Sequence, residues 1–185
     1  MSISVLLLER LGALVHQSVR DDAARHGLLP IHLQVLAYLA RANRYSDIPI
    51  AIAEYFGLTR GTVSQSLAVL ERRGLIVRQA DARHGRRVHL QLTPQGQAVL
   101  DDGWSRQIGE ALGATADAPR VERALRELLR GLQRRNGQRA FGICHQCAHF
   151  QHGGDARCGL TGEPLVEEQS RRICREWTDP AVVAA

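Results

Sequence analysis

Residues 52–78 read IAEYFGLTRGTVSQSLAVLERRGLIVR, and this stretch decides the fold. Its first part is a short apolar segment that ends at Gly57. Thr59 is a good helix N-cap, so a second helix is expected over residues 60–73, closed by Gly74. The buried side of that helix repeats at helical spacing: Val63, Leu67 and Leu70. Two short helices joined by a tight glycine turn are typical of a helix-turn-helix.

The flanking sequence predicts the rest of a winged helix-turn-helix. Helical spacing of apolar residues predicts helices at 4–26, 31–42, 48–56, from Thr93-Pro94 toward Leu112, and at 120–135. Period-two alternation predicts strands at 75–77 and 88–92, joined by a polar tip at 80–87. The expected fold class is therefore mainly α with a small β wing, with flanking helices and a small Cys-rich tail.

The composition changes after Gly137, and all four cysteines follow that residue. We therefore divide the chain into residues 1–136, with a DNA-binding core at about 31–96, and a Cys-rich extension over residues 137–185.

The formal net charge is +5, and all 24 basic residues are arginine. A basic dimer gains affinity for nucleic acid by neutralising phosphates and releasing counterions. No apolar run reaches membrane-spanning length and no secretory leader is visible, so a cytoplasmic protein without a membrane partner is expected.

Candidate DNA contacts fall on the helix at 60–73 and on the wing. Short polar residues lie near the start of this helix, on the face away from its buried stripe: Arg60, Gly61, Thr62, Ser64, Gln65 and Ser66. Arg60 or Gln65 can make paired hydrogen bonds to a base edge. The wing tip carries a compact cationic group suited to the DNA backbone or a minor groove: Arg83, His84, Arg86 and Arg87.

These segments resemble the multiple-antibiotic-resistance regulator (MarR) family. The similarity extends over roughly residues 5–135 and includes Asp81-Ala82-Arg83 in the wing and Leu92-Thr93-Pro94-Gln95-Gly96 after it. The resemblance implies that the flanking first and last helices are dimerisation helices, which interlock in a homodimer. It also implies that the paired reading helices of this dimer enter successive major grooves of a pseudo-palindromic operator. It also implies that Asp81 shapes the wing, that Arg83 enters the minor groove, that a small-molecule effector binds, and that repression is the commoner mode.

One short segment departs from the family pattern. Residues 45–50 read YSDIPI, which places Pro49 where the family starts its third helix more plainly. Proline is tolerated in the first turn of a helix, so the third helix is still expected.

The four cysteines lie in a segment with few large apolar residues, at Cys144, Cys147, Cys158 and Cys174. Such a segment folds when something crosslinks it, and in a reducing compartment a metal is the commoner crosslink. The Cys-x2-Cys pair is a chelating arrangement, and the two single cysteines would complete a four-thiolate site.

The spacing leaves the metal open between two chemistries, and a disulfide or free thiols are a further, lesser alternative. Structural zinc usually shows two Cys-x2-Cys pairs, and only one is present here. The ligand order resembles that of high-potential iron–sulfur proteins, with an aromatic after the first pair and Trp177 after the fourth cysteine. An iron–sulfur cluster of the [4Fe-4S] type is therefore favoured over Zn²⁺. If the centre is a cluster, its loss could change the spacing of the paired reading helices, because the tail follows the last dimer helix directly.

The sequence contains no Ser–His–Asp context, glycine-rich phosphate loop or paired carboxylates of an enzyme. The expected function is a sequence-specific, redox- or metal-responsive transcriptional regulator. Two alternatives remain: the same regulator with a purely structural zinc and a small-molecule effector, or a winged-helix protein-interaction adaptor that does not bind DNA.

Overall fold

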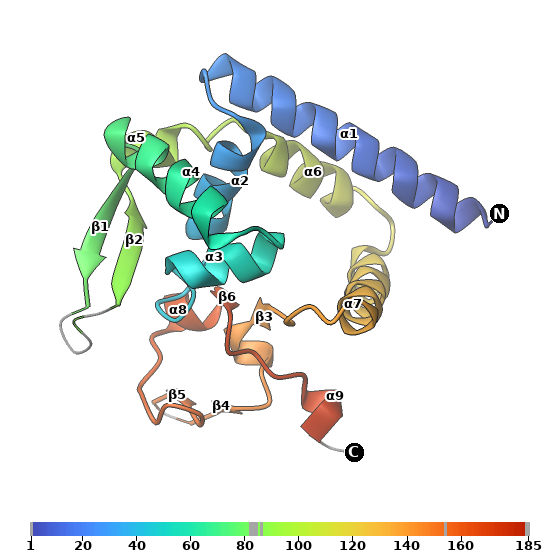
Figure 1. Cartoon of the computed structure of the whole chain (residues 1–185). Coiled ribbons are helices and arrows are strands. Elements are labelled where there is room, and N and C mark those ends of the chain that lie inside the picture. The colour runs from blue at the N-terminus through green and yellow to red at the C-terminus, as the bar shows by residue number, and fades with distance from the viewer. Residues whose placement is uncertain (1, 82–84, 86, 154, 184–185) are drawn as a thin grey trace.

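The computed structural model describes residues 2–81, 85, 87–153 and 155–183. Four helices precede the wing: α1 (Ile3–Arg25), α2 (Pro30–Leu39), α3 (Pro49–Phe56) and α4 (Arg60–Arg72). The wing is an antiparallel hairpin of β1 (Ile76–Ala80) and β2 (Val88–Leu92). Three helices follow it: α5 (Pro94–Ala98), α6 (Trp104–Gly113) and α7 (Ala118–Arg135). This arrangement confirms the expected mainly helical fold with a small β wing (Figure 1).

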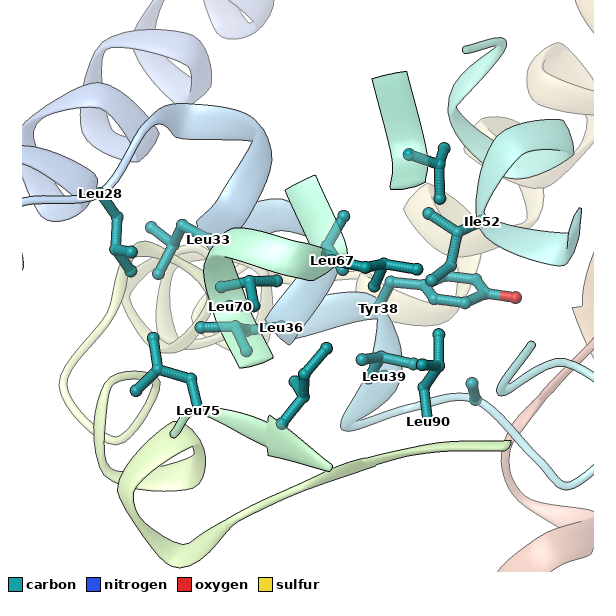
Figure 2. Packing of buried hydrophobic residues seen from close by; sticks show 14 of the residues in the cluster. Leu28, Leu33, Leu36, Tyr38, Leu39, Ile52, Leu67, Leu70, Leu75 and Leu90 are labelled. Carbon is teal, nitrogen blue, oxygen red and sulfur yellow. The ribbon is translucent and has the colours of Figure 1, made fainter. Parts of the chain in front are cut away.

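One core joins the helix-turn-helix to the wing. Side chains from α2, α3, α4 and both wing strands meet in it, as Figure 2 shows for Leu36, Ile52, Leu67 and Leu90. The predicted stripe on α4 is buried, with Val63, Leu67 and Leu70 at most 1% exposed. Burial of this stripe fixes α4 against the rest of the domain, so its opposite face points outward.

The expected single helix from Thr93-Pro94 toward Leu112 is wrong, because α5 ends at Ala98 and α6 begins only at Trp104. The N-cap of α6 is Gly103 in an extended conformation. The backbone N–H of Trp104 donates to the carboxylate of Asp22 on α1, at 2.5 Å. A carboxylate from a distant helix therefore caps α6. The spacing of apolar residues along the chain does not reveal such a contact.

Two other predicted boundaries differ from the structure by three residues. The second helix ends at Leu39 rather than near residue 42, and the first strand continues to Ala80 rather than ending at residue 77. In the first case Arg41 and Asn43 make backbone hydrogen bonds to Ile173 instead of continuing the helix. In the second case Ala80 pairs with Val88 and extends the hairpin.

The described part of residues 137–183, here named the cysteine lobe, contains short elements around a second apolar cluster. They are β3 (Gly142–Ile143), the 3-10 turn η1 (Cys144–Gln146), β4 (Phe150–Gln151), β5 (Arg157–Cys158), α8 (Glu167–Ser170), β6 (Ile173–Cys174) and α9 (Pro180–Val183). β3 pairs with β6 and β4 pairs with β5. In Figure 1 the lobe lies beside α3, on the side of the winged domain away from α1.

The terminal helices expose many apolar side chains. On α7, Leu125, Leu128, Leu129 and Leu132 are between 41% and 52% exposed. On α1, Ile3, Leu7 and Leu11 are more than half exposed. Among the described residues, none of the helices is long and apolar enough to span a membrane.

Candidate nucleic-acid interface and cysteine cluster

The start of α4 presents a polar surface that its N-cap holds in place. The Thr59 hydroxyl accepts a hydrogen bond from the Thr62 backbone N–H at 3.2 Å, which satisfies one free donor of the first turn. Because Gly57 has a φ of +64°, the turn between α3 and α4 is tight. The residues predicted to contact DNA from this helix are all exposed: Arg60, Gly61, Thr62, Ser64 and Gln65.

Ser66 was expected on the same exposed face, and this placement is wrong. Its side chain is buried and its hydroxyl donates to the Thr62 carbonyl at 3.0 Å. Arg73 at the end of α4 also has a structural role, since its guanidinium donates to the carbonyls of Gly27 and His26. These contacts hold the C-terminal end of α4 against the turn after α1.

The wing contributes one exposed arginine among the described residues of its tip, Arg87. The predicted contacts Arg83 and Arg86, together with His84, lie outside the described residues. Arg78 on β1 forms an ion pair with Glu71 of α4 at 2.9 Å, which ties the wing to the candidate reading helix.

Asp81, the predicted wing-shaping residue, lies at the base of the tip. Its carboxylate is 3.2 Å from His89 Nε2, and His89 Nδ1 is 2.6 Å from Asp47 in the segment before α3. Burial disfavours the charged imidazole, but the two carboxylates outweigh it and raise the pKa of His89 above its ordinary value. Burial also raises the pKa of Asp47.

The fold gathers the four cysteines at one place. The β3–β6 pair brings Cys144 and Cys174 together, and Cys158 and Cys147 join them in the second apolar cluster. All four are free thiols, and Cys144, Cys158 and Cys174 are buried. The Cys144 thiol hydrogen-bonds to Cys174 and lowers the pKa of Cys174 to about 7, while the pKa of Cys144 is raised.

Nitrogen donors lie beside the sulfurs of Cys147 and Cys174. The Thr178 backbone N–H donates to Cys147 Sγ at 3.3 Å, and the Glu176 backbone N–H lies close enough to Cys174 to lower its pKa. Such N–H···S contacts favour thiolates, which are the form that binds metals. As placed in the described part of the chain, no set of three or more His, Cys, Asp or Glu side chains has the geometry to hold a metal ion.

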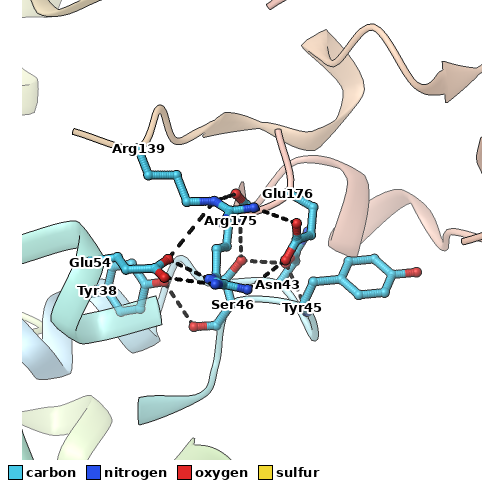
Figure 3. A network of polar contacts seen from close by, with 8 residues as sticks. All are labelled: Tyr38, Asn43, Tyr45, Ser46, Glu54, Arg139, Arg175 and Glu176. Carbon is cyan, nitrogen blue, oxygen red and sulfur yellow. Dashed lines mark hydrogen bonds and ion pairs between the residues drawn. The ribbon is translucent and has the colours of Figure 1, made fainter. Parts of the chain in front are cut away.

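An ion-pair network joins the cysteine lobe to α3, and the sequence did not predict it. The Arg175 guanidinium donates to both oxygens of Glu54, at 2.6 and 2.8 Å, and to Glu176 at 2.7 Å (Figure 3). Arg139 binds Glu176 from the other side. The hydrogen bond from Arg175 lowers the pKa of Glu54, outweighing its partial burial. The sequence offered one sign of this contact, the unusual segment at residues 45–50. This segment leads into α3 beside the lobe.

Comparison with known proteins finds a family similarity in the winged part of the chain. Residues 26–87 match the sequence model described as MarR family. No curated protein matches the chain significantly. Regulators of the MarR family are non-enzymatic DNA-binding proteins, and this is the family to which residues 26–87 are similar.

Known structures extend the similarity beyond the matched segment. The chain is similar to Staphylococcus aureus MepR in its DNA-binding conformation, at 22% identity over 71% of this chain and all of that one, with a TM-score of 0.62. The S. aureus MepR–DNA complex aligns at 23% identity over 72% and 98% of the chains, with a TM-score of 0.54. CouR from Rhodococcus jostii RHA1, bound to p-coumaroyl-CoA, aligns at 25% identity over 71% and 92%, with a TM-score of 0.55.

The fold, the Thr59-capped helix and the family match lie on the same residues. The chain therefore has a winged helix fold, and residues 26–87 of it are similar to the MarR family.

Proposed function

We propose that this protein is a sequence-specific DNA-binding transcriptional regulator. The observation that carries the proposal is the outward polar face of α4, whose position is fixed by its buried leucines and by the Thr59 cap. Polar residues at the start of a helix can reach base edges in a major groove, while the helix N-terminus favours a phosphate. Arg87, and the predicted contacts Arg83 and Arg86, would bind the backbone or minor groove beside it.

The proposed regulator acts as a homodimer. The leucines of α7 and the apolar residues of α1 are too exposed for the surface of a stable monomer, and contiguous apolar surface of this kind marks an interface. A second copy would cover both helices and place two α4 helices on one face, as a pseudo-palindromic operator requires. Repression is the commoner mode in the family that this chain resembles, so we propose repression.

The test is binding to DNA from upstream of the protein's own gene at low ionic strength. We expect saturable binding that a scrambled fragment of equal length does not compete, and a loss of at least tenfold in affinity for Arg60→Ala. Arg120→Ala, which removes an exposed arginine from α7, is the matched control and should bind like the wild type. A wild-type protein indifferent to this DNA would favour the protein-interaction adaptor.

For the cysteine lobe we propose a metal centre held by Cys144, Cys147, Cys158 and Cys174. The support is chemical: four thiols share one apolar cluster with the buried Trp177 and Leu165, and nitrogen donors face two of their sulfurs. The thiols would have to turn toward a common centre on binding. An iron–sulfur cluster is proposed in preference to Zn²⁺, and it would make the regulator responsive to redox state.

Purification without oxygen, followed by visible absorption and iron and zinc analysis, decides the nature of this centre. A brown protein with iron and sulfide supports the redox-responsive regulator. A colourless protein with one zinc per chain overturns the redox version and leaves a structural site. A protein that takes up neither element refutes the centre altogether.

A small-molecule effector also remains a proposal. The structure of CouR contains p-coumaroyl-CoA, which shows that one protein of similar fold binds an acyl-CoA ester. We propose an effector for this chain on that likeness, and calorimetry with a panel of acyl-CoA esters would test it: heat of binding is expected for at least one ester, and no heat with any would contradict this chemistry.

A further inference from the structure

The cysteine lobe is built into the helix-turn-helix through the segment between α2 and α3. Ile173 lies alongside this segment: its backbone N–H donates to the Arg41 carbonyl at 2.7 Å, and its carbonyl accepts from the Asn43 N–H at 2.9 Å. Ala42 and Ile173 thereby form a parallel bridge. The next residue along the chain is Cys174, so the DNA-binding domain lies directly against one of the proposed ligands.

The residue after Cys174 is anchored on the same domain. The Arg175 N–H donates to the Ser46 hydroxyl at 2.7 Å, and its guanidinium binds Glu54 on α3 (Figure 3). Both neighbours of Cys174 are therefore held by residues of the winged domain, which fixes where its sulfur lies relative to α3.

Asn43 occupies the centre of this contact and has an incomplete set of hydrogen bonds. Its side chain is fully buried, and its Oδ1 atom accepts from the Tyr45 N–H at 3.1 Å and from the Ser46 hydroxyl at 2.9 Å. Its Nδ2 atom makes no hydrogen bond of acceptable geometry within the described residues, although the amide lies beside the Cys174 sulfur. A buried amide donor without an acceptor is rare in folded proteins and calls for a physical explanation.

We propose that Asn43 donates its Nδ2–H to the Cys174 thiolate when that thiolate is coordinated, so that the DNA-binding domain supplies a supporting contact to the metal centre. This inference rests on the proposed four-cysteine centre. A thiolate is a stronger acceptor than a thiol, and turning the sulfur toward a metal would complete the geometry that the buried amide lacks. Asn43 is then a positioning residue that orients a ligand from outside the coordination sphere.

The consequence is a link between the centre and the reading helix. The segment that holds Asn43 leads into α3, and α3 packs against α4. Because such linkage is reciprocal, anything that loosens the Cys174 thiolate loosens this segment, and the reverse also holds. This coupling runs from the metal centre through the segment before α3. The hypothesis from the sequence instead had the centre act through the last dimer helix.

The test compares Asn43→Asp with the wild type in the full-length protein. Aspartate has nearly the same shape and keeps an acceptor for Tyr45 and Ser46, but it replaces the donor with a negatively charged oxygen. Metal-free protein is titrated with Zn²⁺ against a chromophoric chelator, and a loss of about 10–100-fold in zinc affinity is expected. Asn136→Asp, at the exposed end of α7, is the matched control and should keep the wild-type affinity.

A second measurement uses the wild type and so does not depend on how well the variant folds. In protein loaded with ¹¹³Cd²⁺, the Asn43 side-chain amide proton should move downfield and show scalar coupling to the metal across the N–H···S contact. A protein that binds Cd²⁺ through four thiolates, with the Asn43 resonances unmoved and zinc affinity of the variant within twofold, overturns this inference alone. A wild type that binds neither ion overturns the proposed centre as well.

Discussion

His89 connects two parts of the winged domain through its two ring nitrogens. Asp47 belongs to the segment before α3 and Asp81 to the wing tip, and each carboxylate faces one nitrogen. Only the protonated imidazole can donate to both carboxylates at once. The resemblance to a family singled out Asp81, but its contact with His89 depends on the strand register, in which Ala80 pairs with Val88, and on the path of residues 40–48.

This geometry predicts a pH-dependent stability. The pKa of His89 is raised in the folded protein, so its contribution is fully present below the unfolded value of about 6.5 and is lost as the pH rises through the folded value. We expect His89→Gln to lower the free energy of unfolding by about 1–2 kcal/mol near pH 6, and by less at pH 8. Urea unfolding at both pH values measures this difference, and an equal loss at each pH would refute the charged bridge.

At the scale of the elements, the packing around residues 92–96 explains the short Leu-Thr-Pro-Gln-Gly motif at which the chain leaves the wing. Thr93 caps α5 by accepting from the Gly96 N–H at 3.0 Å, and its own hydroxyl donates to the Gly74 carbonyl at 2.6 Å. A Cβ atom on Gly96 would lie 2.0 Å from the Leu75 carbonyl oxygen. The motif therefore packs the start of α5 against the backbone at the end of the α4–β1 turn.

Gly96→Ala should therefore be strongly destabilising, because the obstacle is a backbone carbonyl that cannot turn aside. We expect a loss of about 2–3 kcal/mol, at the upper end of what overpacking costs. Thermal unfolding of this variant beside Gly109→Ala, whose added Cβ would meet nothing within 4 Å, supplies the measurement and its control. Equal melting temperatures for the two variants would contradict the tight packing described here.

Local signals were sufficient for most elements. The cap at Thr59, the glycines after α3 and α4, and the leucine stripe each act within a few residues, and they located the helix-turn-helix and the outward face of α4. The break between α5 and α6 could not be found in this way, because the Asp22 carboxylate that caps α6 lies 82 positions earlier in the chain. The buried position of Ser66 likewise depends on how α4 packs.

At the scale of the whole molecule, two surfaces of the winged domain are suited to contacts beyond the domain itself. One is the apolar side of α7, which follows from the spacing of its leucines. The other is the docking of the cysteine lobe on residues 41–54, which the sequence could not predict because Arg175 and Glu54 are 121 positions apart. The unusual segment at residues 45–50 marked the place without indicating what packs there.

Leu129 lies on the exposed apolar side of α7, and Leu129→Arg should separate the proposed dimer. An arginine in an apolar interface loses hydration without a partner, so the dimer dissociation constant should rise by at least tenfold, or about 1.4 kcal/mol. Sedimentation equilibrium measures this change, with Glu127→Arg on the same helix as a control for added charge. If both variants sediment as the wild type does, α7 does not form the interface.

Specific DNA binding by this protein requires that α4 lie in a major groove while the wing holds the backbone beside it. The most direct measurement is the affinity for operator DNA over a range of salt concentrations, for the wild type, Gln65→Ala and Arg87→Ala. We predict that Gln65→Ala costs about 1–3 kcal/mol and relaxes the preference at one base position, whereas Arg87→Ala weakens all sequences alike and lowers the salt slope by about one. Unchanged affinity, base preference and salt slope in both variants would contradict the proposed interface.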